Sequence, residues 1–295
     1  MVLDQRTKRY LKVFLLVFAL VVLVGCKSNL DSDGNLIASR AITGSTKWTI
    51  DAGIFDFLLV IPIAKGILFI ESVTGNVIWG VIGMTILINI IILPVMIKSS
   101  VSTQKMQLVQ PEIERIQNKY KGKNDQASQM RMSQEIQNLY KKYDINMFSS
   151  FIMFVTFPIM IAMWQAVQRV QILYSSSFLG LDLGATPMSM IGKGHYQYVI
   201  LIVIMALTQF GAMQINQIMS KRSQKVYPNE KNPMDQMKTM NYMMTAMIVY
   251  FGLVMPSAMS FYWITTNIIT VLRTVYIQIH YIEKELDANK KNVVR

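Results

Sequence analysis

The sequence alternates between long apolar runs and polar segments that are rich in lysine and arginine. Five apolar runs have about 20 residues each, the length that a helix needs to cross the hydrocarbon of a bilayer. These predicted spans cover residues 77–98, 148–172, 197–218, 239–255 and 259–279. Pro256 interrupts the chain between the last two, which should form a tight hairpin. The pattern therefore predicts an all-α membrane protein with five transmembrane helices.

A sixth apolar run, at residues 54–76, is less regular. Pro62, Lys65 and Gly66 interrupt it, and Gly75-Asn76 at its end is typical of a turn. We therefore predict an interfacial amphipathic helix on the extracytoplasmic side instead of a span.

The N-terminus has the layout of a signal peptide. Four basic residues within the first 12 precede a short apolar run at 13–22. The only cysteine, Cys26, ends the tetrad LVGC, which resembles the lipobox of bacterial lipoproteins, where the cysteine becomes the lipidated first residue. We predict a signal peptide over 1–25, lipidation of Cys26 and a polar extracytoplasmic linker over 26–53. An uncleaved N-terminal anchor is the alternative.

Charge sets the orientation of the predicted spans. Only 16% of the residues are charged, 52% are hydrophobic, and the net charge is +12. The basic residues gather in 99–147, in 219–238 and in the tail 280–295, whereas 173–196 carries only Lys193. The positive-inside rule places the first three segments in the cytoplasm and 173–196 outside. This topology accounts for the positive charge, so we predict no specific nucleic-acid site.

The first basic segment, 99–147, has helical periodicity. Apolar residues recur at helical spacing on both sides of the turn-like sequence KGKND at 121–125. We predict a cytoplasmic helical hairpin. It is either a cover for the bundle or a docking arm for a ribosome or an incoming chain.

Polar side chains inside the predicted spans are the candidate functional residues. Such residues are costly in hydrocarbon and usually face the bundle interior or a wet cavity. Ordinary hydrogen bonds between helices explain one or two per helix, but a hydrophilic groove open to the cytosol explains a set spread over four spans better. The candidate groove residues, with two aromatic neighbours, are Thr85, Asn89, Thr156, Gln165, Gln209, Tyr262, Trp263, Thr266, Asn267, Thr270 and Arg273.

Arg273 is the one charged residue in this set. It shares a helical face with Thr266 and Thr270 and lies about 21 Å below the outer hairpin at 1.5 Å per residue. Its side chain either lines the groove or extends to the cytoplasmic headgroups.

The sequence contains no recognisable catalytic motif. His195 and His280 are far apart, no predicted span contains Asp or Glu, and no nucleotide-binding or metalloprotease motif occurs. We therefore predict a protein that is not an enzyme and that needs no cofactor or metal.

Several stretches together resemble the YidC/Oxa/Alb family of membrane protein insertases, in its Gram-positive lipoprotein form. The stretches, in chain order, are MQLVQPEIERIQNKYKGK (106–123), EIQNLYKKYDIN (135–146), FPIMIAMWQAVQR (157–169), FLGLDLGATP (178–187) and MPSAMSFYWITTNIITVLRTVY (255–276). The resemblance implies a five-span core with a groove open to the cytosol and lipid but closed outside. It also implies nascent membrane proteins, the ribosome, the Sec translocon, the signal recognition particle pathway and membrane lipids as partners.

One departure from the family pattern concerns Asn89. The family has Thr-x-x-x-Arg-x-x-x-x-Pro in its first conserved span, whereas this chain has Thr85, Asn89 and Pro94. Our hypothesis is that the positive charge has moved to Arg273, where relatives commonly carry Gln. The other possibility is a groove without intramembrane charge.

Two other classes of function remain open from the sequence. A solute channel or transporter would need a polar path across the whole membrane, but the outer ends of the predicted spans have few polar residues. A membrane assembly factor that docks partners without inserting them would tolerate apolar substitutions in the groove.

Overall fold

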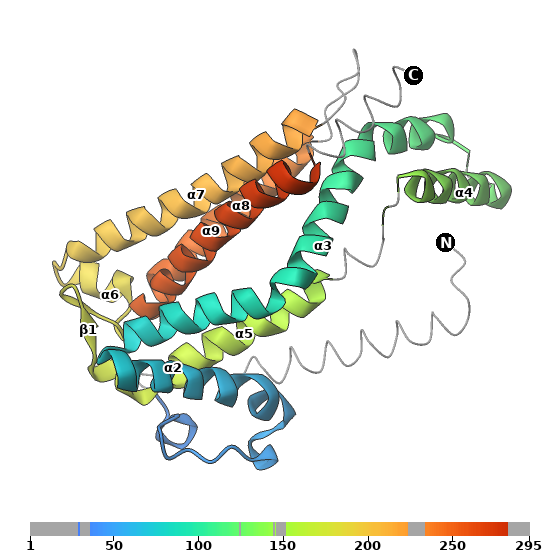
Figure 1. The fold of residues 1–295 in the computed structure, drawn as a ribbon. Helices are drawn as coiled ribbons and strands as arrows, with labels where there is room; N and C mark the ends of the chain where they lie inside the picture. The colour runs from blue at the N-terminus through green and yellow to red at the C-terminus, as the bar shows by residue number, and fades with distance from the viewer. Residues whose placement is uncertain are drawn as a thin grey trace.

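The computed structural model describes residues 29, 36–123, 125–143, 145, 152–223 and 234–282. Cys26 and the predicted signal peptide lie outside these residues. The regular secondary structure of the described residues is helical apart from one two-stranded antiparallel sheet and an isolated β-bridge between Ile42 and Val170 (Figure 1). The main helices are α2 (Ile61–Thr74), α3 (Val77–Lys119), α4 (Gln126–Lys142), α5 (Ile152–Arg169), α6 (Pro187–Gly192), α7 (Gln197–Ser223), α8 (Met234–Val254) and α9 (Ser257–Ile277). Shorter elements are η1 (Ala38–Arg40), η2 (Ile50–Ala52), η3 (Asp56–Val60), η5 (Gln171–Ser175), β1 (Ser177–Phe178), β2 (Leu181–Asp182) and η6 (Gln278–Ile282).

The prediction of an all-α membrane protein is confirmed. Among the described residues, three helical stretches, at 56–74, 77–103 and 197–219, are long and apolar enough to cross a membrane, and a shorter apolar helix covers 241–254. The first of these is the run that we assigned to the membrane surface. The count of five spans stays a prediction.

α2 and α3 pack closely against each other. The turn between them uses Gly75, whose φ of 77° is in the left-handed region that favours glycine. Asn76 then caps α3, because its side chain accepts a hydrogen bond from the Ile78 amide at 3.0 Å. A Cβ at Gly80 would clash with the Ile67 carbonyl oxygen, so this glycine permits the close approach of the two helices.

α3 is longer than the sequence pattern predicted. We placed a boundary between a span ending at 98 and a hairpin beginning at 99, but α3 continues through this point to Lys119. At 1.5 Å per residue, its 43 residues extend about 65 Å. The apolar run ends near Lys98, but nothing in the backbone interrupts the helix there. Pro94 and Pro111 both lie within it.

The end of α3 and α4 form a helical hairpin, here called the arm (residues 106–123 and 125–142). Val109 and Ile113 of α3 and Leu139 of α4 are buried in a small apolar cluster with Ile145. Other apolar residues of the hairpin pack against this cluster, whereas Met130 is exposed. We call the end of the molecule that holds β1 and β2 the sheet end, and the opposite end the arm end (Figure 1).

A charged contact joins the two helices of the arm near its tip. Glu135 accepts hydrogen bonds from Lys119 Nζ at 2.7 Å and from the Tyr120 hydroxyl at 2.8 Å. These bonds, the one from Lys119 first, hold the pKa of Glu135 below its usual value. Hydrogen bonds from Ser128 likewise lower the pKa of Asp125, which caps α4. Both carboxylates therefore stabilise the arm above their unfolded pKa values, and this stabilisation is lost as pH falls through the folded values.

We expect the arm to loosen slightly in acid. Amide hydrogen exchange in 119–135, corrected for its intrinsic pH dependence, should accelerate as pH falls below about 4.5, the ordinary Glu value. The change should be small because the groups are exposed and screened. Glu135→Gln should remove part of the pH dependence, and Asp125→Asn, which keeps a capping side chain, should remove the rest. A pH dependence that persists in the double variant would contradict this assignment.

The remaining helices form the body of the molecule. α9 packs between α3 and α7, and α8 packs beside α7 (Figure 1). The predicted hairpin at Pro256 is present, since α8 ends at Val254 and α9 begins at Ser257. At the sheet end, α2, α3, α5 and the start of α9 bury a continuous apolar core. The loop before α7 covers this end, because the amides of Ser257 and Ala258 donate to the carbonyls of Ala185 and Leu183.

Candidate functional site

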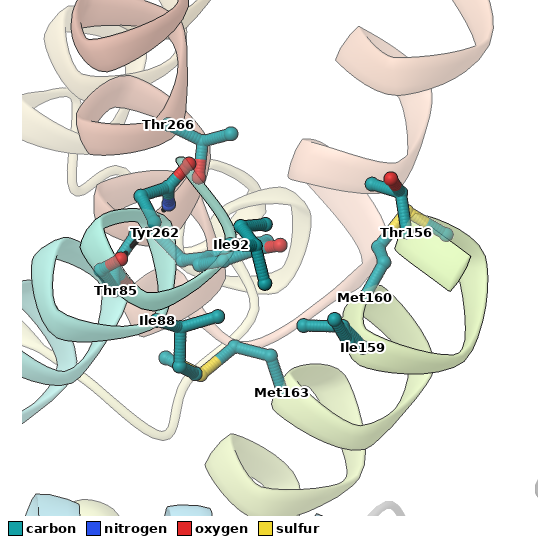
Figure 2. A pocket seen from close by; sticks show the side chains of 10 residues that line it. Thr85, Ile88, Ile92, Thr156, Ile159, Met160, Met163, Tyr262 and Thr266 are labelled. Atoms are coloured by element: carbon teal, nitrogen blue, oxygen red, sulfur yellow. Dashed lines mark hydrogen bonds between the residues drawn. The ribbon is translucent and has the colours of Figure 1, made fainter. Parts of the chain in front are cut away.

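A small, partly open cavity of about 50 Å³ lies between α3, α5 and α9. α3 contributes Thr85, Ile88, Asn89 and Ile92, which repeat at helical spacing and so share one face. α5 contributes Thr156, Ile159, Met160 and Met163, and α9 contributes Tyr262 and Thr266. Figure 2 shows the side chains of α5 on one side of this space, and those of α3 and α9 on the other. The lining is thus partly polar and partly apolar.

The polar groups on α3 are tied to their own helix. The Thr85 hydroxyl donates to the Val81 carbonyl at 2.7 Å, and Asn89 Nδ2 donates to the Thr85 carbonyl at 2.8 Å. Such i to i−4 bonds satisfy donors locally. The Asn89 side chain therefore lowers the cost of its own burial and still has an amide oxygen that can accept a hydrogen bond.

The polar groups on α5 and α9 have different surroundings. Thr156 Oγ1 donates to Met96 Sδ at 3.7 Å, a weak contact between α5 and α3. Thr266 Oγ1 is buried near the Tyr262 hydroxyl, and it makes no hydrogen bond of acceptable geometry within the described part of the chain. A buried hydroxyl without a partner costs free energy, so a molecule that offers one would be stabilised here.

The cavity is closed toward the sheet end. Met163 and Tyr262 belong both to its lining and to the apolar core of that end. On the α5 side, Met160 is 38% exposed and neighbouring Phe157 is 36% exposed. The cavity is therefore sealed at one end and accessible along α5.

A second polar cluster reinforces the sheet end. Asn29 Nδ2 donates to the side-chain oxygens of Gln165 at 2.8 Å and of Gln168 at 3.1 Å, and Arg40 donates to Asn29 Oδ1 at 3.3 Å. Gln165, predicted as a groove residue, thus lies in this cluster and not in the cavity lining. Fully buried Ile42 exchanges backbone hydrogen bonds with Arg169 and Gln171. Parts of the segment that we predicted as a linker are therefore packed against the end of α5.

A row of polar contacts also joins α7 to α9. Asn267 Nδ2 donates to Thr208 Oγ1 at 3.5 Å, and Thr274 Oγ1 donates to Asn216 Oδ1 at 2.8 Å. Asn267 and Thr274 are seven residues apart on the same face of α9, and both are buried. We call these four residues the α7–α9 seam. Asn267 therefore faces α7 and not the cavity.

The structure brings five of the predicted groove residues together in the cavity: Thr85, Asn89, Thr156, Tyr262 and Thr266. Gln209, Thr270 and Arg273 are half-buried and do not line it. Trp263 packs against the apolar core at the sheet end. Arg273 continues the helical face of Tyr262 and Thr266 toward the arm end, about 10 Å beyond Thr266 along the axis.

Sequence reasoning missed the apolar half of the lining, which is Ile88, Ile92, Ile159, Met160 and Met163. Their spacing from Thr85 and Thr156 at i+3, i+4 and i+7 was the available signal. Among the described residues, no group of three His, Cys, Asp or Glu side chains could hold a metal ion.

Comparisons with known proteins match almost the whole chain. Residues 69–285 match the family described as 60Kd inner membrane protein. The membrane protein insertase YidC of Alkalihalophilus pseudofirmus is 28% identical over 287 residues, 96% of this chain and 100% of that protein. The membrane protein insertase MisCA of Bacillus subtilis is 32% identical over 80% of this chain and 84% of that protein. The membrane protein insertase YidC 2 of Listeria innocua is 30% identical over 92% of this chain and 84% of that protein.

Proposed function

The chain belongs to the 60Kd inner membrane protein family, and on this premise we propose that it is a membrane protein insertase. It takes hydrophobic segments of nascent proteins through a groove open to the cytosol and passes them into the bilayer, alone or with the Sec translocon. The observation that carries this proposal is the cavity between α3, α5 and α9, which has a partly polar lining, is accessible along α5 and is closed at the sheet end.

The lining fits both parts of an inserting segment. The polar flank of the client finds hydroxyl and amide partners at Thr85, Asn89, Thr156 and Thr266, while its apolar part faces the isoleucines and methionines. Burial of about 20 apolar residues in lipid then supplies the free energy for release from the cavity. The proposed function therefore uses no nucleotide and no bond-making chemistry.

We further propose the topology that the charge pattern predicts. The arm end faces the cytosol and the sheet end faces outward, with a lipid anchor on Cys26 and α2 near the outer membrane surface. The arm is then a docking site for the ribosome, the signal recognition particle pathway or the Sec translocon. Its position at the cytosolic end of α3, beyond the cavity, supports this role.

Photo-crosslinking tests the proposed function. We would place a photoreactive residue at Asn89, Thr266 and Arg273 in turn, with Ile91 and Leu272 as controls on the same helices. These controls are 66% and 65% exposed. Ribosome-bound chains with one transmembrane segment should attach at Asn89 and Thr266 and not at the controls. Absence of attachment anywhere in a folded protein would favour an assembly factor, and measurable solute flux would favour a transporter.

The contribution of Arg273 is a separate prediction. Because Arg273 is half-buried but does not line the cavity, we expect Arg273→Gln to change insertion by less than about fivefold, which corresponds to about 1 kcal/mol. Insertion into proteoliposomes measures this effect, and Arg273→Lys is the control that keeps the charge. A severe defect in Arg273→Gln, rescued in Arg273→Lys, would show that the charge expected at position 89 has moved to Arg273.

A further inference from the structure

The cavity between α3, α5 and α9 is uncharged. None of its ten lining residues is ionisable at neutral pH, and its polar groups are three threonines, one asparagine and one tyrosine. An ionised carboxylate or ammonium that entered it would lose hydration without meeting an opposite charge. That loss is far more costly than the burial of a neutral polar group.

The hydrogen-bonding groups of the lining suit neutral partners. The Thr85 hydroxyl and the Asn89 amide nitrogen donate to backbone carbonyls of their own helix, α3. The Asn89 amide oxygen can therefore accept a hydrogen bond from a client. Thr266 adds a buried hydroxyl that makes no hydrogen bond of acceptable geometry among the described residues. An amide or hydroxyl on a client can donate to the Asn89 amide oxygen, and it can donate to or accept from the Thr266 hydroxyl.

The nearest basic residue on the cavity face of α9 is too far away to change this picture. Arg273 lies seven residues beyond Thr266, which is about 10 Å along the helix. Arg273 also lies outside the cavity lining, so it does not contact a group held beside Asn89. Arg273 therefore acts on a chain that approaches from the arm end, and not on a group held beside Asn89.

We propose that Asn89 makes the cavity selective for client segments whose flanking residues are polar but uncharged. This inference rests on the proposed insertase function and names its substrate class. We assign the selectivity to Asn89 because it is the one amide among the ten lining residues, and its side chain can both donate to and accept from a neutral polar group.

The test uses three versions of one single-span client that differ at one flanking position, which is Asn, Asp or Lys. The full-length protein is reconstituted in liposomes without a membrane potential, so that the field does not act on the client charge. We expect the wild type to insert the Asn client about fivefold better than either charged client. Ratios between clients within one preparation cancel any loss of folded protein.

Charge-bearing variants at Asn89 should then reorder the clients. Asn89→Arg should favour the Asp client and Asn89→Asp the Lys client, whereas Asn89→Gln should keep the wild-type order. Gln214→Arg is the matched control, because Gln214 is a half-buried polar residue of α7 outside the cavity. It should leave the order unchanged.

The outcomes separate the two proposals. If no client inserts above protein-free liposomes, the insertase function fails. If all clients insert but the wild type treats them equally, or if the Asn89 variants keep the wild-type order, the selectivity proposal is overturned and the insertase function stands.

Discussion

The double variant Asn89→Leu, Thr266→Val should insert clients about tenfold more slowly than the wild type while it remains folded. Each substitution removes hydrogen-bonding groups that face the cavity and nearly preserves the side-chain volume. Two hydrogen bonds of about 0.5–1.5 kcal/mol each correspond to roughly a tenfold effect or more. The fold should tolerate the change, because Asn89 bonds only within α3 and Thr266 Oγ1 makes no hydrogen bond of acceptable geometry in the described chain.

Thr274→Val is the matched control for this experiment. Like Thr266→Val, it removes a threonine hydroxyl from α9, but the Thr274 hydroxyl lies in the α7–α9 seam and not in the cavity. We expect it to lower the unfolding temperature slightly, since contacts of this kind contribute about 0.6 kcal/mol, and to leave insertion per folded molecule unchanged. Insertion into proteoliposomes and thermal unfolding measure the two effects. Normal insertion by the double variant would exclude the cavity as the client path.

The sequence predicted the helices of the body well because the lengths of apolar runs are limited by the bilayer. The run at 197–218 corresponds to α7, and the runs on either side of Pro256 correspond to α8 and α9. The span end predicted near Lys98 does not coincide with a helix end, because the loss of hydrophobicity marks the end of a span and not the end of a helix. Helix ends depend on capping and backbone-breaking residues, but α3 continues through both Pro94 and Pro111 as far as Lys119.

Part of the candidate site was predicted from the sequence, because polar side chains within apolar runs are easy to identify. Polar residues in an apolar run are conspicuous, so Asn89 and Thr266 were found. However, adjacent residues on a helix point about 100° apart, and the sequence does not tell which neighbour each one faces. Thr266 and Asn267 illustrate this, since the first lines the cavity and the second bonds to Thr208 of α7. The Gln165 side chain accepts a hydrogen bond from Asn29, which is 136 residues away in the sequence. No local sequence pattern indicates such a contact.

The ion pair at the sheet end should have the largest effect on stability. Arg169, the last residue of α5, contacts Asp56 Oδ2 through one guanidinium nitrogen at 2.5 Å and donates from Nε to the Arg40 carbonyl at 2.8 Å. The two charged side chains are only 12% and 19% exposed. One residue thus joins α5 to η3 and to the chain near η1.

Removal of one partner should be much more harmful than removal of both. We expect Arg169→Met to lower the free energy of unfolding by about 3–5 kcal/mol, because it leaves the Asp56 carboxylate poorly solvated without its counter-charge. Asp56→Leu should have a similar effect, and the double variant should recover much of the loss. Unfolding of the four proteins in one lipid or detergent system gives the coupling energy of the pair.

The same variants test whether the sheet end seals the cavity. If the Arg169 contacts hold α5 against η3, a single variant should let small ions leak across liposomes, whereas the double variant should restore the seal. Lys119→Gln, which breaks the exposed ion pair in the arm, is the control and should change neither leakage nor unfolding appreciably. Single variants within 1 kcal/mol of the wild type would show that the pair behaves as an ordinary surface contact. Closure of the cavity would then rest on the apolar core around Met163 and Tyr262 alone.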